Sequence, residues 1–150
     1  MLIRAGRAGD AARLSALALR SKAHWGYDEA FLEACRAELT LREDEIVARR
    51  TLVAERDGQP LGFVTVEGEP PQGELGMLFV EPAEIGRGLG RRLFSAALET
   101  ARAAGFTRLT VEADPHAEGF YQAMGARRIG EAPSGSVPGR NLPLLAVEVA

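Results

Sequence analysis

The feature that most constrains the fold of this chain is a glycine-rich turn, Gly86-x-Gly88-x-Gly90, which joins a short extended stretch to an amphipathic segment. Glycine has no Cβ, so successive glycines let the backbone approach a ligand closely. The first N–H groups of the following helix have no partner inside the helix, and they attract an anion. The turn therefore suits a phosphate or pyrophosphate, although a tight strand-to-helix turn without a ligand uses glycines in the same way.

Two familiar phosphate-binding loops do not match this turn. The dinucleotide fingerprint spaces its glycines more widely and stands near the start of a Rossmann fold, whereas this turn is short and lies past the middle of the chain. The P-loop ends in Gly-Lys-Ser/Thr, which is absent here. The turn therefore belongs to another kind of fold.

Size and composition narrow the function classes. The 150 residues suit one domain over residues 1–150, and the net charge of -3 does not favour a nucleic-acid partner. The single cysteine, Cys35, excludes an internal disulfide and leaves no cluster for a metal, so we expect no metal. No stretch reads as a signal peptide or membrane span, so we expect a cytoplasmic protein without a membrane partner.

The hydrophobic pattern predicts helices and strands in a mixed order. We expect a strand at Leu2–Ala5, a helix capped at Gly9-Asp10 that ends near Lys22, and a second helix capped by Asp28 that buries Cys35. A hairpin is expected at residues 51–55 and 61–67 around the Asp57-Gly58 turn. The other predicted elements are a loop at 68–73, a strand at 75–80, the helix from the glycine turn to Gly105, a strand at 109–112, a short helix at 117–124, and strands at 126–130 and 142–149.

Two motifs resemble the GNAT superfamily of N-acetyltransferases. Strand 75–80, its Val80-x-Pro82 exit and the glycine turn resemble the acetyl-CoA-binding core. Asp114-x-x-Ala-x-x-Phe-Tyr121-x-x-x-Gly125 is similar to the family's Asn-x-x-Ala-x-x-Phe/Leu-Tyr-x-x-x-Gly-Phe element. The element order agrees over essentially the whole chain. The resemblance implies an α/β (α+β) GNAT fold: a central mixed, mostly antiparallel sheet flanked by helices, with a splayed central strand. Many relatives are homodimers, so a homodimer is also expected.

Two positions depart from that pattern. Ile85 stands where the family usually has Gln or Arg, which should matter little because backbone amides hold the pyrophosphate. Asp114 stands where the family often has Asn, and a carboxylate cannot donate a hydrogen bond as an amide does. Residues 21–27 and the tail 133–140 also resemble a small bacterial GNAT subgroup.

The resemblance implies transfer of an acetyl group from acetyl-CoA to a primary amine of a small molecule or protein, by direct attack through a tetrahedral intermediate. The backbone of the splayed strand would hold the thioester carbonyl and the pantetheine. The residues expected to bind the coenzyme are Leu78, Phe79, Val80, Gly86, Arg87, Gly88, Leu89, Gly90, Arg91, Asp114 and Tyr121.

Two residues are candidates for proton transfer. Tyr121 matches the family's tyrosine beside the CoA sulfur, where it either donates a proton or only packs on the coenzyme. Glu74 stands where histone-acetylating members keep a glutamate and would act as a base through water, although a solvated strand end explains it equally. Many members work without a dedicated base.

The acceptor is expected to meet two other segments. His24, Trp25 and Tyr27 would wall its pocket, and His24 is an alternative base. Ser136 and Arg140, in the loop between the closing strands, would bind the acceptor, Arg140 especially if it carries a carboxylate or phosphate. A packed loop histidine and a flexible surface loop are the structural alternatives.

Three other functions remain open on the same fold. A non-catalytic acyl-CoA sensor or scaffold would explain the absence of a clear base, although Tyr121 speaks against it. A longer acyl chain depends on pocket depth. A toxin that acetylates aminoacyl-tRNA would need a basic face, which the net charge of -3 disfavours.

Overall fold

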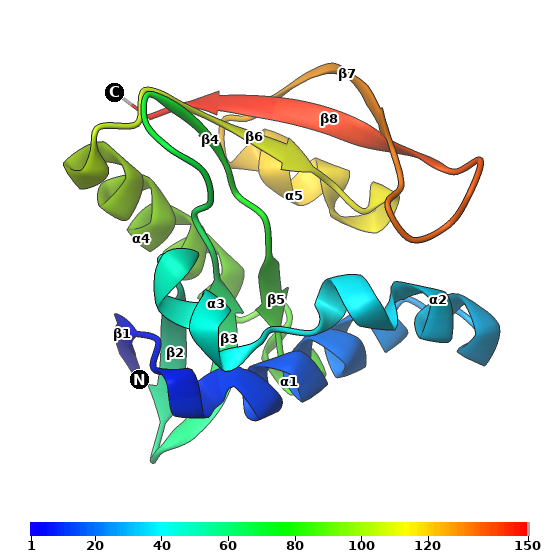
Figure 1. Ribbon diagram of the computed structural model, residues 1–150, viewed down its shortest axis with the longest axis horizontal. Helices are drawn as coiled ribbons and strands as arrows, with labels where there is room; N and C mark the ends of the chain where they lie inside the picture. Colours follow the sequence, from blue (N-terminus) through cyan, green and yellow to red (C-terminus); the bar gives the residue numbers. More distant parts are fainter. Residues whose placement is uncertain (150) are drawn as a thin grey trace.

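The computed structural model describes residues 1–149, which form two four-stranded sheets with helices around them (Figure 1). The strands are β1 (Leu2–Ala5), β2 (Leu52–Arg56), β3 (Gln59–Val64), β4 (Gln72–Glu74), β5 (Leu78–Val80), β6 (Arg108–Glu112), β7 (Arg127–Pro133) and β8 (Asn141–Glu148). One sheet has the order β1-β2-β3-β5 and is antiparallel. The other has the order β4-β6-β8-β7, in which only β4 and β6 are parallel.

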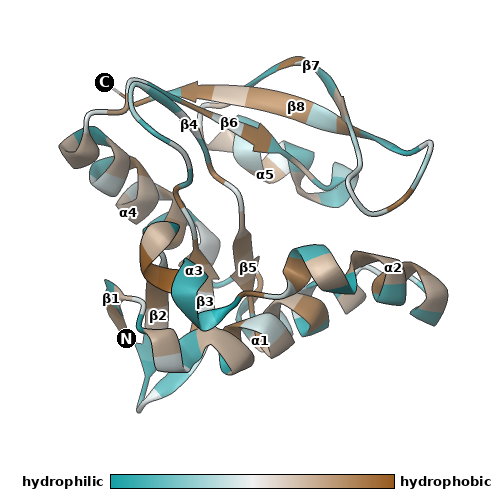
Figure 2. Ribbon diagram, in the orientation of Figure 1, coloured by the Kyte–Doolittle hydropathy of each residue, from teal (hydrophilic) through white to brown (hydrophobic). Residues whose placement is uncertain are grey.

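Helices cover both faces of the first sheet. The helices are α1 (Ala11–Ala23), α2 (Glu29–Leu39), α3 (Glu43–Ala48), α4 (Leu89–Ala104) and α5 (Glu118–Ala123). Of these, α1 and α4 contact the first sheet from opposite faces, whereas α5 contacts β7 of the second sheet. Successive side chains of a strand point to opposite faces. Val53 and Phe63 accordingly pack in the cluster that contains α1 and α2, whereas Ala54 and Val64 pack in the cluster that contains α4. The second cluster extends to β8, which is brown along most of its length in Figure 2.

Strands β4 and β5 are successive parts of one extended segment that changes sheets. The N–H of Leu75 donates a hydrogen bond at 2.9 Å to the carbonyl oxygen of Thr110, which is part of β6. The carbonyl oxygen of Met77, two residues later, accepts one at 2.9 Å from the N–H of Thr65, which directly follows β3. The segment therefore leaves one sheet and joins the other between residues 75 and 77, which confirms the splayed central strand. Gly76 lies at this change of sheet, and a Cβ there would overlap the carboxylate of Glu67 and require that side chain to move.

Several sequence predictions need correction. The strand predicted at 75–80 is interrupted, and part of the loop predicted at 68–73 belongs to β4. Helix α3 was not predicted because Ile46 is its only buried residue, so it lacks an apolar period. Asp10 does not cap α1; its carboxylate accepts a hydrogen bond from the Arg7 N–H at 2.8 Å and pairs with Arg4.

The other helix predictions hold. Asp28 caps α2 by accepting a hydrogen bond from Phe31 N at 2.8 Å, and Cys35 is buried. Helix α4 begins after Gly88 and ends at Gly105, and both glycines have positive φ. In the described part of the chain, no helix combines the length and the apolar character that a bilayer crossing requires.

Candidate active site

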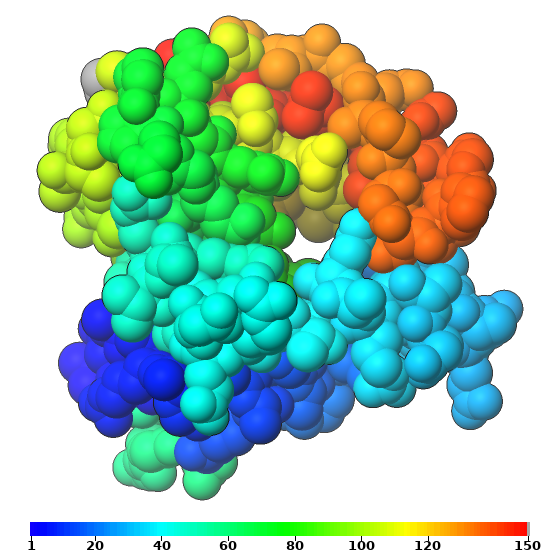
Figure 3. Space-filling model, in the orientation of Figure 1, coloured from blue at the N-terminus to red at the C-terminus, as the bar shows by residue number. Residues whose placement is uncertain are grey.

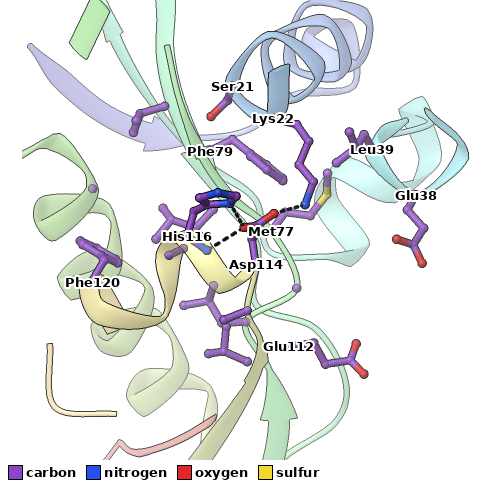
Figure 4. Close-up of a pocket in the computed structure, with 18 of the residues that line it drawn as sticks. Ser21, Lys22, Glu38, Leu39, Met77, Phe79, Glu112, Asp114, His116 and Phe120 are labelled. Carbon is purple, nitrogen blue, oxygen red and sulfur yellow. Dashed lines mark hydrogen bonds and ion pairs between the residues drawn. The ribbon is translucent and has the colours of Figure 1, made fainter. Parts of the chain in front are cut away.

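A cavity of about 1150 Å³ lies where the two sheets separate. It is lined by β5, the end of β6, the start of α4, the last turn of α1, and parts of α2 and α5. Figure 3 shows the surface hollowed where residues near 40, residues near 75 and the β7–β8 loop approach one another. In Figure 4, Phe120 lies on one side of the cavity and Glu38 and Glu112 on the other, with Asp114 between them.

The glycine turn offers free backbone donors to this cavity. Gly86 and Gly88 have φ of 85° and 81°, and no atom lies within 4 Å of the position that a Cβ would occupy on either residue. The hydrogen bond from Arg92 N to Gly88 O, at 3.2 Å, is the first of α4, so the three preceding N–H groups have no carbonyl to bond within the helix. This arrangement attracts an anion.

The predicted coenzyme residues of this turn lie together, with one exception. Gly86, Gly88, Leu89, Gly90 and Arg91 line the cavity. Arg87 is outside that lining: its side chain is 68% exposed and lies 3.7 Å from the carboxylate of Glu84.

The register of β5 decides which of its amides face the cavity. The hydrogen bonds of Met77 and Glu81 to β3 place residues 77, 79 and 81 in hydrogen-bonded pairs. The backbone of Phe79 is therefore directed at β3, whereas the N–H groups of Leu78 and Val80 are directed away from β3 into the gap between the sheets. All three residues line the cavity, but two of them present free donors.

Tyr121 is buried at the edge of the cavity. Its ring lies 5.2 Å from that of Phe120 and 6.1 Å from that of Phe94. Burial, and then the negative charge of Asp114, raise the pKa of the phenol above its usual value. The hydroxyl therefore stays protonated and is available as a donor.

Glu74 lies in a group of carboxylates where the strand changes sheets. The backbone N–H of Glu67 donates a hydrogen bond to Glu74 O at 2.8 Å, and the N–H of Glu74 donates to Glu67 O at 2.9 Å. Burial raises the pKa of Glu74, and the charges of Glu112 and Glu67 raise it further, while Arg49 opposes the shift. Glu74 is thus a stronger base than an ordinary carboxylate.

Asp114 is the centre of a polar network. It accepts hydrogen bonds from Lys22 Nζ at 2.6 Å and Tyr27 Oη at 2.8 Å, and Arg140 donates to Tyr27 Oη at 2.9 Å. Burial alone would raise the pKa of Asp114, but Lys22 and the His116 N–H lower it to about 2. Burial, and then Asp114, raise the pKa of Tyr27 to about 12.

Of the residues predicted to bind the acceptor, only Trp25 lines the cavity. Its ring stacks on that of His116 at 5.0 Å. Tyr27 and Arg140 lie outside the cavity lining, as does His24, whose ring meets that of Trp25 edge-on at 5.3 Å. Ser136 also lies outside it; within residues 1–149 its Oγ is buried without a hydrogen-bond partner.

Sequence reasoning did not assign Lys22, Glu38, Met77, Glu112 or Phe120 to the site, yet all of them line the cavity. Lys22 is the only lysine of an arginine-rich chain, and that was the one signal available. Phe120 belongs to the Asp114-x-x-Ala-x-x-Phe-Tyr121 motif. Glu38, Met77 and Glu112 have no such distinguishing signal, so only the three-dimensional arrangement finds these three.

Known proteins share this fold. The model of the Acetyltransferase (GNAT) family matches residues 17–126. The GCN5-related N-acetyltransferase from Rhodopseudomonas palustris is 29% identical, with a TM-score of 0.79 over 98% of this chain and 94% of that one. The PaiA N-acetyltransferase from Thermoplasma acidophilum, solved in complex with coenzyme A, is 20% identical, with a TM-score of 0.81 over 98% of each chain.

A curated relative matches over a shorter stretch. IAA acetyltransferase of Azospirillum brasilense is 38% identical over 76 residues, which are 49% of this chain and 46% of that protein. The match thus spans about half the length of the relative. The family model, in contrast, covers most of this chain and includes the splayed strand, the glycine turn and Tyr121. This protein belongs to the GNAT acetyltransferase family and is an acyltransferase enzyme.

Proposed function

We propose that this enzyme transfers an acetyl group from acetyl-CoA to a primary amine of a small molecule or a protein. The observation that supports this most directly is one cavity lined by two sets of backbone donors, the start of α4 and the outward amides of β5. The first set fits a pyrophosphate and the second fits a pantetheine arm with its thioester carbonyl. The PaiA relative was solved with coenzyme A, which agrees with this assignment.

Each group has a defined role in the proposed reaction. The N–H groups of Leu89, Gly90 and Arg91 bind the pyrophosphate, and those of Leu78 and Val80 orient the acetyl carbonyl and stabilise the oxyanion of the tetrahedral intermediate. The neutral amine attacks the carbonyl carbon, the C–N bond forms, and the C–S bond breaks.

Two side chains move the protons. Glu74 accepts the proton of the attacking amine through water, and its raised pKa suits that task. Tyr121 donates its hydroxyl proton to the departing thiolate, which avoids release of a charged sulfur into a buried site.

The charges around the cavity favour an acceptor without a carboxylate beside its amine. Among the residues described, no cation lies within ion-pair distance of Glu38, Glu74 or Glu112, whereas Arg36 and Arg49 on the same lining pair with Glu33 and Glu45. Arg91, the lining cation without an ion pair among these residues, stands at the start of α4, where the pyrophosphate is proposed to bind. A protonated or polyamino acceptor is attracted by this field.

A change at Glu112 tests the base. In Glu112→Gln the negative neighbour that helps to raise the pKa of Glu74 is lost, so the acidic limb of the kcat/KM profile is expected to move to lower pH. The measurement is kcat/KM against pH with one amine. The matched control is Asp44→Asn, an equivalent change at a carboxylate that is 73% exposed and outside the cavity lining. If the acidic limb of the kcat/KM profile lies at the same pH in both variants, Glu74 is not the base.

The function itself is tested by calorimetry with acetyl-CoA and by thiol release over amines, amino acids and N-terminal peptides. Binding with thiol release on one acceptor class is the expected result. Binding without release on any acceptor would favour the sensor alternative, and absence of binding would refute the proposal.

A further inference from the structure

We infer that Asp114 is a positioning residue that holds the acceptor side of the cavity, and that it is not a ligand of the coenzyme. The inference rests on the proposed function, in which the cavity binds an acceptor amine as well as the coenzyme. It concerns the position at which the chain departs from the family motif, with Asp in place of Asn.

The carboxylate of Asp114 has no free acceptor position. Its Oδ2 accepts from Lys22 Nζ at 2.6 Å and from Tyr27 Oη at 2.8 Å. Its Oδ1 lies 2.8 Å from the backbone N of His116 and 2.8 Å from the ring Nδ1 of His116 (Figure 4). An ionised carboxylate has about four lone-pair sites, so these four contacts occupy all of them when Nδ1 of His116 carries a proton. A donor of the coenzyme would have to displace one of these partners.

An asparagine cannot replace this carboxylate in the network. Its amide has one acceptor oxygen, and its NH₂ group would face either the donors of Lys22 and Tyr27 or the backbone N–H of His116. One pair of donors would then lose its acceptor inside a site where the side chains of Lys22 and Asp114 are only 14% and 11% exposed. The network therefore gives a physical reason for the departure from the family motif.

The network joins two segments that are distant in sequence. Tyr27 lies in the loop after α1, and its hydroxyl accepts from Arg140 in the β7–β8 loop, 113 residues away. The guanidinium of Arg140 lies 4.7 Å from the ring of Phe31, and that ring stacks on Tyr27. Residues 21–27 and the tail 133–140 both resemble the same bacterial GNAT subgroup, and one hydrogen-bond network joins them in the structure.

These two segments shape the cavity wall. Trp25 lines the cavity and stacks on His116, which is bonded to Asp114. Gly135 lines it from the other loop and lies against the carboxylate of Glu38, where a Cβ would collide. Because Lys22 and Arg140 bind within the network, they hold this wall, and recognition of the acceptor is left to the other lining residues.

The test compares Asp114→Asn with the exposed control Asp44→Asn. We expect Asp114→Asn to bind acetyl-CoA within about two-fold of the parent in calorimetry, to raise the acceptor KM by about ten-fold and to change kcat less than the acceptor KM. Amide hydrogen exchange is expected to become faster in residues 24–27 and 134–140 of the free protein. Tyr27→Phe, which keeps the charge of Asp114 and breaks the link to Arg140, is expected to loosen 134–140 in the same way.

A double variant separates positioning from general damage. Lys22→Met combined with Asp114→Asn is expected to raise the acceptor KM no further than Asp114→Asn alone, because both changes break the same contact. The inference is overturned if Asp114→Asn loses about ten-fold or more in acetyl-CoA affinity while exchange in the two loops is unchanged. Calorimetry and exchange need no turnover, so they decide this point even if no amine proves to be a substrate.

Discussion

Replacing Gly88 by leucine is expected to lower the affinity for acetyl-CoA by about 100-fold or more. Gly88 is the N-terminal cap of α4 and lines the cavity, and the space where its side chain would begin contains no atom within 4 Å. A leucine there would occupy the space in front of the free N–H groups, where we place the pyrophosphate. The measurement is calorimetric titration with acetyl-CoA.

Gly58 provides a control with matched backbone strain. Its φ is 78°, close to the 81° of Gly88, and it too has no atom within 4 Å of the position that a Cβ would occupy. Leucine at either position adopts a left-handed conformation at a cost of about 1–2 kcal/mol, so the two variants should lose similar thermal stability. Gly58 lies in the turn between β2 and β3, outside the cavity lining. If both variants bind acetyl-CoA equally well, the glycine turn is not the pyrophosphate site.

Tyr121→Phe is expected to lower the rate of acetyl transfer by about 100-fold, the usual scale for a positioned general acid, and to leave acetyl-CoA affinity nearly unchanged. The phenyl ring keeps the contacts with Phe94 and Phe120. Within residues 1–149 the Tyr121 hydroxyl forms no hydrogen bond with another side chain, so its removal leaves no side chain unsatisfied. The expected loss therefore belongs to the reaction and not to folding.

Single-turnover kinetics give the clearest measurement of this loss, because slow product release cannot then conceal a change in the chemical step. The melting temperature of Tyr121→Phe serves as its internal control and should stay close to that of the parent. An unaltered single-turnover rate would leave Tyr121 with a packing role only.

Local patterns predicted most of the fold. Helix α4 was recognisable because its apolar period lies between two glycines that adopt positive φ, and the hairpin of β2 and β3 because alternating residues flank Asp57-Gly58. The point where β4 gives way to β5 depends on which strand lies beside each residue. That information is in the tertiary pairing with β3 and β6, and no local pattern carries it.

The two halves of the candidate site differ in how far the sequence alone predicts them. The expected coenzyme contacts are largely backbone N–H groups of one turn and one strand, so a short motif identifies them. The proposed acceptor side depends on contacts such as that of Lys22 with Asp114, which are 92 residues apart. The chemistry of Tyr27 and Arg140 predicts contacts with an acceptor, but in the structure the two side chains bind each other, and Tyr27 binds Asp114. No spacing rule reveals such a pair.

The alternation along β5 has a consequence for how this protein tolerates mutation. The donors that face the gap belong to the main chains of Leu78 and Val80, while Phe79 between them keeps the strand attached to β3. A side-chain substitution at Leu78 or Val80 leaves its N–H in place; proline alone among the twenty amino acids removes it. Variation at these two positions can therefore be broad in hydrophobic residues yet closed to proline, and sequence identity there is a poor guide to whether the site is intact.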